Sequence, residues 1–308
     1  MIKSYLIIYS YGEQSGFGHQ TRAKIIKNYI TNNIKSKVLI ASISDKDVKK
    51  TNVDENILKK IKSKKINILI LDLNYFHIQE KNKIINTLNF IKKKGIKIVG
   101  VDSLRNFYKF LDIVWIPSPF KQKNLNSKNI VYGVDKMIFN RYRFSFNKLK
   151  KIVFLVGGSK NKEISNNLPK MIEKNISKEF KLIWIKSRFS HWPKFINKKR
   201  WVIYDNTNSL KNVFKQSGFV FSLYGISFFE SLSCGIPTVA FCTKKNYNKD
   251  LEEIKFFRRK KFFFIETNLI KAIQKLKNLV SDKKMSLSCS VKSRKYFNNY
   301  NLSFLKKI

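Results

Sequence analysis

Histidine, cysteine and acidic residues are scarce in this chain of 308 residues. It has three histidines and three cysteines, and its 20 Asp and Glu face 63 Lys and Arg, a net charge of +43 at pH 7. The cysteines are odd in number and are not spaced like metal ligands, and no cluster of His, Cys and carboxylates has zinc spacing. We therefore expect no metal or other cofactor, and thiols of this kind suit a reducing, cytoplasmic compartment.

A cleavable leader and a membrane-spanning run are also lacking. The N-terminus, MIKSYLIIYSYGEQ, has a short apolar run without a small-residue cleavage site, which is typical of a first strand. The most apolar long window, residues 219–242, contains Glu230, two glycines and Pro237, which argues against a transmembrane helix. The basic aromatic run at residues 256–265 fits a membrane interface or, as we favour, a basic turn before a buried strand. We expect at most a loose association with membranes.

The large positive charge does not by itself indicate a nucleic-acid-binding protein. Nine of the 63 basic residues are arginine, whereas base recognition and tight phosphate binding favour arginine. The lysines are spread along the chain and accompany many Asn, Ile and Phe residues, which share A/T-rich codons. We interpret the lysine excess as compositional and expect no specific nucleic-acid partner, with charge-driven nucleic-acid binding as the rival hypothesis. A basic surface also attracts anionic substrates such as nucleotide sugars.

Alternating apolar and amphipathic segments predict two α/β domains. In the first half, strand-like apolar runs lie at residues 5–10, 37–42, 66–73, 96–103 and 113–118. Two clear helices are predicted at residues 19–33 and 79–95. The pattern restarts in the second half, where strands are predicted at residues 151–159, 180–187, 200–206, 219–224 and 237–242. The helices predicted between them lie at residues 166–176, 209–216 and 227–235. This order predicts two doubly wound, Rossmann-like domains, residues 1–145 and 146–308. Ligands of such sheets bind beyond the C-terminal ends of the strands, so we expect the site in a cleft between the domains.

The segment SGFGHQTR follows the first predicted strand and opens the first helix. Its glycines, Gly16 and Gly18, allow a tight turn and a close approach of the backbone to a ligand, and the helix N-terminus can hold an anion. The spacing GxGHxxR is not the dinucleotide fingerprint, because Thr21 occupies the third glycine position. The alternative interpretation of this segment, including His19, is an ordinary strand-to-helix turn with a capping polar residue.

Two further glycine turns lie in the second half. SLYGISFFESLSCGIPTVAF, residues 222–241, predicts a strand, a glycine turn, a helix and another strand. Glu230 lies three residues after Ser227, which is the capping-box distance. The same carboxylate at the mouth of a cleft could instead hold a ribose diol through charge-assisted hydrogen bonds. VGGSKNKE, residues 156–163, is a second glycine-ended strand whose backbone could contact a phosphate.

Taken in order, these segments resemble GT-B-fold enzymes that act on UDP-sugars. The resemblance covers nearly the whole chain. It is greatest to the UDP-sugar hydrolases of pseudaminic acid biosynthesis, and more distant to the peptidoglycan N-acetylglucosaminyltransferases. Asp72 in ILDL and Asp102 in IVGVDSL also resemble strand-end aspartates of the hydrolases.

The resemblance implies roles for individual residues. His19 would activate or position water, or an acceptor hydroxyl, at the anomeric carbon, and Arg22 matches the motif arginine, which could equally pair with Asp102. The loop beside the diphosphate would be formed by Gly16, Phe17 and Gly18, and the turn near the nucleotide by Gly157, Gly158 and Ser159. The contacts to diphosphate and ribose would come from Gly225, Ile226, Ser227 and Glu230. Asn246 matches an amide after the next strand. The chain departs from the pattern at Tyr224, Ile226 and Tyr247, which leaves an inactive family member open.

The sequence therefore predicts a metal-independent, monomeric enzyme of surface-glycan or nonulosonate synthesis that releases UDP from a UDP-sugar. Water is the expected acceptor, and transfer to a glycan or lipid acceptor is the alternative. Of the other histidines, His77 follows a predicted strand end, where we expect a surface or capping histidine rather than a cleft residue. We assign His191 to a loop.

Overall fold

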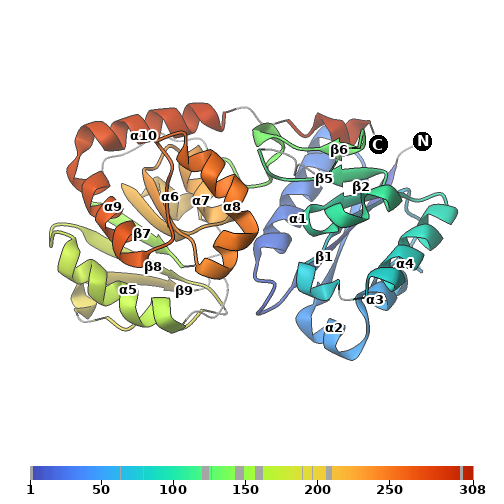
Figure 1. Cartoon of the computed structure of the whole chain (residues 1–308), viewed down its shortest axis with the longest axis horizontal. Helices are drawn as coiled ribbons and strands as arrows, with labels where there is room; N and C mark the ends of the chain where they lie inside the picture. The colour runs from blue at the N-terminus through green and yellow to red at the C-terminus, as the bar shows by residue number, and fades with distance from the viewer. Residues whose placement is uncertain are drawn as a thin grey trace. The chain divides into compact units, whose positions relative to one another are not determined.

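The computed structural model describes residues 3–62, 64–78, 80–119, 125, 127–142, 149–156, 162–188, 190–195, 197–205, 210–298 and 301–307, with only the backbone described for 244–250. The chain folds into two compact units (Figure 1). The N-terminal unit comprises Met1–Ile138 and Asn299–Ile308, and the C-terminal unit comprises Phe139–Asn298.

The N-terminal unit contains a six-stranded parallel sheet in the order β2-β1-β3-β4-β5-β6. Its elements are β1 (Ser4–Tyr11), α1 (Gly18–Tyr29), the π-helix η1 (Ile30–Ile34), β2 (Lys37–Ser44), α2 (Asp45–Lys50), α3 (Val53–Ile61), β3 (Ile68–Asp72), the 3-10 helix η2 (Tyr75–His77), α4 (Lys81–Lys93), β4 (Lys97–Val101), η3 (Asp102–Phe110), β5 (Ile113–Trp115), β6 (Ile130–Val131) and η4 (Val134–Lys136). The order reverses at β1, which pairs in parallel with both β2 and β3. The strands are continuous apolar runs because helices cover both faces of the sheet.

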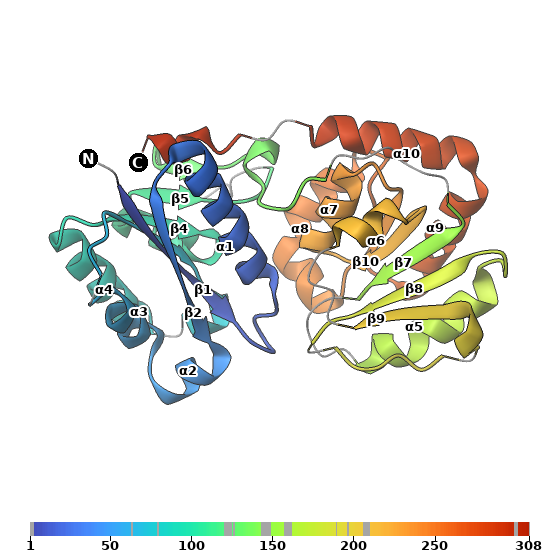
Figure 2. The same cartoon turned by 180° about the vertical axis from the view of Figure 1, so that it is seen from behind.

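Alternate residues of β1 separate the two faces of this sheet. Leu6 and Ile8 pack with apolar side chains of α3 and α4, whereas Tyr5 and Ile7 pack with those of α1. Figures 1 and 2 show α1 on one side of the sheet and α3 and α4 on the other. Side chains in a strand point alternately to opposite faces, so each face of β1 has its own buried layer.

The C-terminal unit repeats the architecture with the strand order β12-β11-β10-β7-β8-β9. Its elements are β7 (Lys151–Leu155), α5 (Lys162–Asn175), β8 (Lys181–Lys186), η5 (Lys198–Arg200), β9 (Trp201–Asp205), α6 (Lys211–Lys215), β10 (Phe219–Leu223), α7 (Ile226–Ser233), β11 (Thr238–Phe241), α8 (Lys244–Arg258), β12 (Phe264–Glu266), α9 (Leu269–Ser281) and α10 (Lys283–Tyr296). All of these strands pair in parallel. The two doubly wound sheets confirm the predicted fold class.

The basic aromatic run at residues 256–265 forms the end of α8, a turn and β12. Phe257 and Phe263 are buried, with ring centroids 5.0 Å apart, and Lys261 has a φ of +57°. The run is therefore a basic turn before a buried strand, as favoured from the sequence. None of the described helices is both long and apolar enough to cross a membrane.

The C-terminal segment returns to the N-terminal unit. Leu302 and Leu305 are fully buried in its core, and the Phe304 ring lies 4.9 Å from that of Trp115. The short 3-10 helix η6 (Ser303–Lys306) lies near β5 and α1 in both ribbon views (Figure 2). The sequence pattern places all residues after 145 in the second domain, whereas residues 301–307 pack in the core of the N-terminal unit, which corrects that expectation.

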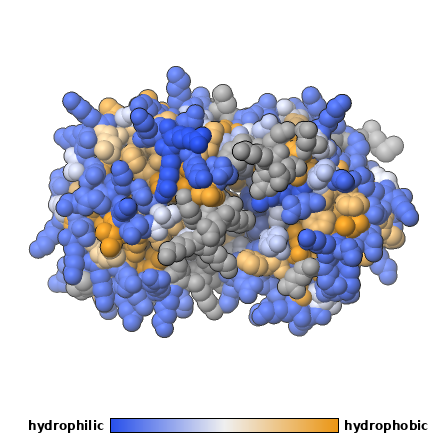
Figure 3. Space-filling model, viewed as in Figure 1, coloured by the Kyte–Doolittle hydropathy of each residue, from blue (hydrophilic) through white to orange (hydrophobic). Residues whose placement is uncertain are grey.

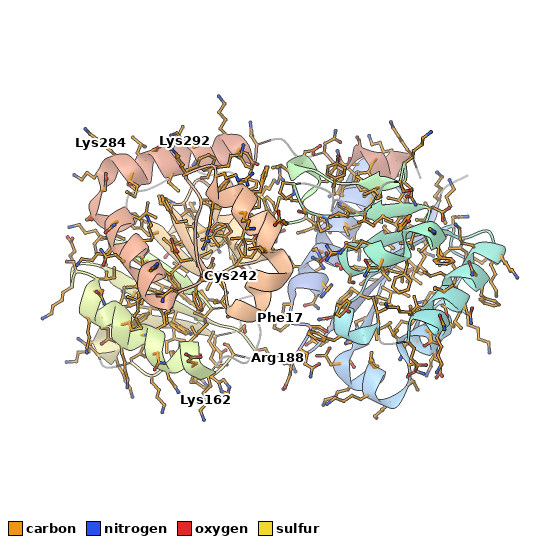
Figure 4. The ribbon with its side chains drawn as sticks, viewed as in Figure 1. Phe17, Lys162, Arg188, Cys242, Lys284 and Lys292 are labelled. Atoms are coloured by element: carbon orange, nitrogen blue, oxygen red, sulfur yellow. The ribbon has the colours of Figure 1, made fainter. Side chains whose placement is uncertain are left out.

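Hydrophilic side chains predominate on the visible face of the molecule (Figure 3). Figure 3 shows polar residues over most of the visible face, with apolar residues in small separate groups. Lys284 and Lys292 project from α10 (Figure 4), and both are exposed.

Candidate active site

The turn between β1 and α1 closes on itself before the helix begins. Gly16 donates its backbone N–H to the carbonyl oxygen of Gly12 at 2.8 Å, and its φ of +66° lies in the left-handed region that favours glycine. Helix α1 begins at Gly18, with Phe17 at the N-cap position (Figure 4). The Phe17 ring packs edge-on against Tyr11 at 5.8 Å. A phenyl ring cannot cap a helix, so the ordinary capped turn is not formed, and His19 lies in the first turn of α1.

His19 and Arg22 both contact the carboxylate of Asp72, the last residue of β3. Arg22 donates Nε–H to Oδ2 at 2.8 Å and Nη2–H to Oδ1 at 2.7 Å, forming a bidentate pair. His19 Nδ1 lies 2.8 Å from Oδ1. Asp72 is fully buried, whereas the side chain of His19 is 13% exposed. Residues three apart face the same side of a helix, so α1 aims both side chains at one strand end.

The hydrogen bonds fix which nitrogen of His19 is available for chemistry. Burial by itself raises the pKa of Asp72, but the guanidinium charge of Arg22 and the hydrogen bonds from His19 and Arg22 lower it to about 2, so the carboxylate is ionised. Arg22 Nη2 also lies 2.9 Å from His19 Nδ1. Nδ1 faces the ionised oxygen of Asp72, and two acceptors at that distance would repel each other, so Nδ1 carries the hydrogen and donates it to Asp72. Arg22 Nη2–H donates to the same oxygen, and in the neutral ring the lone pair is then on Nε2.

Asp102 completes this group at the end of β4. Its Oδ2 lies 3.7 Å from Arg22 Nη1, so Arg22 pairs chiefly with Asp72 and only weakly with Asp102, the partner named from the sequence. Asp102 has a φ of +53°, an uncommon conformation for a residue other than glycine. The structure thus brings together four predicted site residues from three chain segments: His19, Arg22, Asp72 and Asp102.

A second polar network, centred on Asp45, was not predicted from the sequence. The carboxylate of this first residue of α2 accepts the Ser15 hydroxyl at 2.6 Å and the Gln14 backbone N–H at 2.8 Å. A Cβ added to Gly12 would lie 2.1 Å from Asp45 Oδ2, so glycine is needed there for the close approach. Asp45 thereby holds the Gly12–Gly16 turn that leads into α1.

His77 belongs to the same network, which corrects the expectation of a surface or capping histidine. It is 5% exposed, with Nε2 2.8 Å from Asp45 Oδ1 and Nδ1 2.8 Å from the Ser10 hydroxyl. Burial lowers the pKa of His77 despite the nearby carboxylate, which favours the neutral ring. Ser10 also accepts the Asn74 backbone N–H at 2.7 Å, which links the ends of β1, β2 and β3.

In the C-terminal unit, the glycine turn after β10 leads into α7. Gly225 is at the N-cap position with a φ of +153°, Ile226 begins the helix, and Ser227 forms no cap hydrogen bond. The capping-box interpretation of Ser227 and Glu230 is therefore wrong. Glu230 is 3% exposed, and its Oε1 accepts the backbone N–H of Asn140 at 3.1 Å and its side-chain amide at 2.7 Å.

Burial makes Glu230 an unusual carboxyl group. Desolvation raises its pKa to about 7, although both hydrogen bonds from Asn140 favour the ionised form. The group therefore titrates near neutral pH. The neighbouring Tyr224 donates its hydroxyl to Glu253 and packs its ring against Phe228 and Phe229.

Some predicted site residues have no described contacts. Gly157, Gly158 and Ser159, predicted at a turn near the nucleotide, lie outside the described residues. Asn246 lies within α8, in the stretch whose side chains are not described.

No family model and no curated protein matches the sequence. Solved structures match the fold over nearly its whole length. MurG from Acinetobacter baumannii is 9% identical with a TM-score of 0.59, covering 95% of each chain. The spinosyn rhamnosyltransferase SpnG with thymidine diphosphate is 9% identical with a TM-score of 0.60, covering 98% of this chain and 99% of its own. A UDP-N-acetylglucosamine 2-epimerase is 11% identical with a TM-score of 0.56, and the match covers 100% of this chain and 97% of the epimerase chain.

The chain has the GT-B fold. In each half of this GT-B fold, the candidate residues lie where ligands of open α/β sheets bind, at the C-terminal ends of the strands. His19 follows β1, Asp72 ends β3, Asp102 follows β4, and Gly225 follows β10.

Proposed function

We propose that this protein cleaves the anomeric C–O bond of a UDP-sugar and releases UDP. The observation that carries the proposal is the His19–Asp72 pair, a histidine with a 13% exposed side chain held by a buried carboxylate at the edge where open α/β sheets bind ligands. A histidine whose Nδ1–H is bound by a carboxylate presents Nε2 as a proton acceptor. This is the arrangement that general-base catalysis requires.

His19 acts on the attacking hydroxyl in this proposal. As the oxygen bonds to the anomeric carbon, its proton passes to Nε2, and the bond from that carbon to the diphosphate oxygen breaks. Asp72 stabilises the imidazolium that forms, and Arg22 keeps the Asp72 carboxylate ionised and oriented. The N-terminal N–H groups of α7, which follows the Gly225 turn, are suited to the developing charge on the leaving UDP.

Glu230 and the Gly225 turn hold the nucleotide. The buried carboxyl of Glu230 accepts the ribose hydroxyls, and the backbone at Gly225 approaches the diphosphate. Burying a carboxyl group costs free energy and adds nothing to apolar packing. Its presence at this position therefore supports a role in binding a ligand. We extend the same role to Gly157, Gly158 and Ser159 on the resemblance alone.

Water is the first acceptor that we propose, as in the pseudaminic acid pathway hydrolases that the motifs resemble. The same groups would serve transfer to a sugar or lipid hydroxyl, and the likeness to the rhamnosyltransferase SpnG supports this second candidate. The two reactions differ only in the oxygen that loses its proton to His19.

UDP release from a panel of UDP-sugars, with and without glycan acceptors, tests the proposal. His19→Asn should lower turnover by about 10²–10⁴ while UDP affinity, measured by calorimetry, stays nearly unchanged. His191→Asn is the matched control, because His191 lies in a loop of the C-terminal unit. A folded His19→Asn variant with full turnover, or a wild-type protein that binds no UDP, would contradict the proposed function.

A further inference from the structure

The N-terminal unit contains a pocket with a volume of about 410 Å³ that the proposed reaction does not use. It lies beyond the C-terminal ends of β1, β2 and β3, the edge at which open α/β sheets bind ligands. Pockets of this size accommodate small organic ligands. We call it the acidic pocket, and its lining residues are Gln14, Asp45, Val48, Lys49, Asn52, Val53, Asp54, Phe76, His77 and Glu80.

The charge of the acidic pocket is opposite to that of the protein. The whole chain has about three basic residues for each acidic one, but the pocket is lined by three carboxylates and one lysine. Lys83, outside the lining, pairs with Glu80 at 2.8 Å and offsets part of this charge. Even with Lys83 included, the acidic residues outnumber the basic ones. The local charge of the lining therefore favours neutral or cationic groups over phosphate.

The pocket combines an aromatic wall with planar polar side chains. Phe76 is 48% exposed on η2, beside Tyr75, whose ring lies 6.3 Å away. Tyr75 does not line the pocket, so Phe76 is its aromatic wall, and an exposed aromatic side chain beside a pocket can pack against a ligand. A sugar ring presents apolar C–H groups to such a wall and hydroxyl groups to carboxylates and amides, which Gln14, Asn52 and Asp54 supply.

Two of the lining side chains are held in place by hydrogen bonds. His77 and Asp45 are fixed to each other at 2.8 Å, and Ser10 and Ser15 hold them in turn. Preorganised walls reduce the entropy that binding must overcome. Hydrogen bonds between side chains therefore hold part of the lining in place.

We propose that the acidic pocket binds a sugar that is uncharged or carries an amine, and that it excludes phosphorylated sugars. Phe76 packs against the C–H face of the ring, and Asp54 and Glu80 accept hydrogen bonds from its hydroxyl or ammonium groups. This proposal goes beyond the release of UDP, because it concerns a second ligand bound by the N-terminal unit, and it does not depend on UDP binding.

Saturation-transfer NMR with the full chain and three probes, glucosamine, methyl glucoside and glucose 6-phosphate, tests this proposal. The first two should receive saturation at millimolar concentration, and glucose 6-phosphate should not. Phe76→Ala should weaken binding of both sugars about tenfold or more. Phe90→Ala is the matched control, because Phe90 is also 48% exposed in the same unit but does not line the pocket.

A second variant tests the charge independently of the aromatic wall. Asp54→Asn with Glu80→Gln should weaken glucosamine binding about tenfold, leave methyl glucoside less affected, and reduce the exclusion of glucose 6-phosphate. Equal binding of all three probes, or binding that survives both variants in folded protein, would overturn the proposal. A protein that binds UDP in calorimetry but none of these sugars would overturn it too, while leaving the proposed function intact.

Discussion

The buried carboxyl of Glu230 predicts that a single isosteric substitution will stabilise the protein and impair it. Glu230→Gln keeps an oxygen that can accept both hydrogen bonds from Asn140, and it removes the ionisable group. In the folded protein burial raises the pKa from 4.5 to about 7, so the folded state binds the proton more tightly than the unfolded state does. Stability therefore falls as the pH rises between these two values.

The size of the effect follows from the same shift. One pKa unit corresponds to about 1.4 kcal/mol, so ionised Glu230 destabilises the folded state by about 3 kcal/mol at pH 8. At pH 5 the folded carboxyl is protonated, and the predicted difference is less than about 1 kcal/mol. Glu230→Gln should accordingly raise the free energy of unfolding at pH 8 far more than at pH 5.

Urea unfolding followed by tryptophan fluorescence is a suitable assay. Three of the four tryptophans, Trp184, Trp192 and Trp201, belong to the C-terminal unit that contains Glu230, so the signal reports mainly on that unit. Glu252→Gln is the matched control, because its side chain is 69% exposed in the same unit, and it should show no such gain at pH 8.

UDP binding completes this prediction. If Glu230 holds the ribose, Glu230→Gln should weaken UDP binding roughly ten- to hundredfold, because a charge-assisted hydrogen bond contributes about 1.5–3 kcal/mol. A gain in stability together with a loss of affinity identifies a group retained for function at the expense of stability. The absence of any stability gain at pH 8 would refute the burial argument, and unchanged UDP affinity would refute the ribose assignment.

Three further predictions concern the turn before α1 and the surface charge. Asp45→Asn should loosen the turn that positions His19 and so lower turnover roughly ten- to hundredfold, with UDP affinity unchanged. Steady-state kinetics measures the turnover and calorimetry the affinity, and unaltered turnover would contradict this prediction. Gly16→Ala should destabilise by about 1–2 kcal/mol because of its positive φ, whereas Gly18→Ala, at a helical residue, should not; thermal melts compare the two. DNA binding should be sequence-blind and lost at moderate salt, and selective binding at physiological salt in a titration would favour the nucleic-acid hypothesis.

The sequence predicts most strands of this fold because parallel strands buried on both faces are continuous apolar runs. Residues 66–73 and 219–224 are of this kind, and both become strands with buried residues. Other features have no comparable local signal. β6 spans two residues, and residues 301–307 offer only a few apolar side chains, so their place in the N-terminal core depends on the folded sheet. Glycine turns, in contrast, mark the site in the sequence because they require particular backbone angles.

In the candidate site, too, contacts within one helix can be predicted from the sequence, whereas contacts between distant segments cannot. His19 and Arg22 are one helical turn apart, so their common direction is a local property of the sequence, and both reach Asp72. Asp45 and His77 are 32 residues apart and become partners only because β2 and β3 flank β1. That strand order brings the ends of β1, β2 and β3 together around the Gly12–Gly16 turn. The turn is therefore held by Asp45 on the β2 side, and the helix that follows it is held by Asp72 at the end of β3. A change at Asp45 or at Asp72 should therefore alter the position of His19.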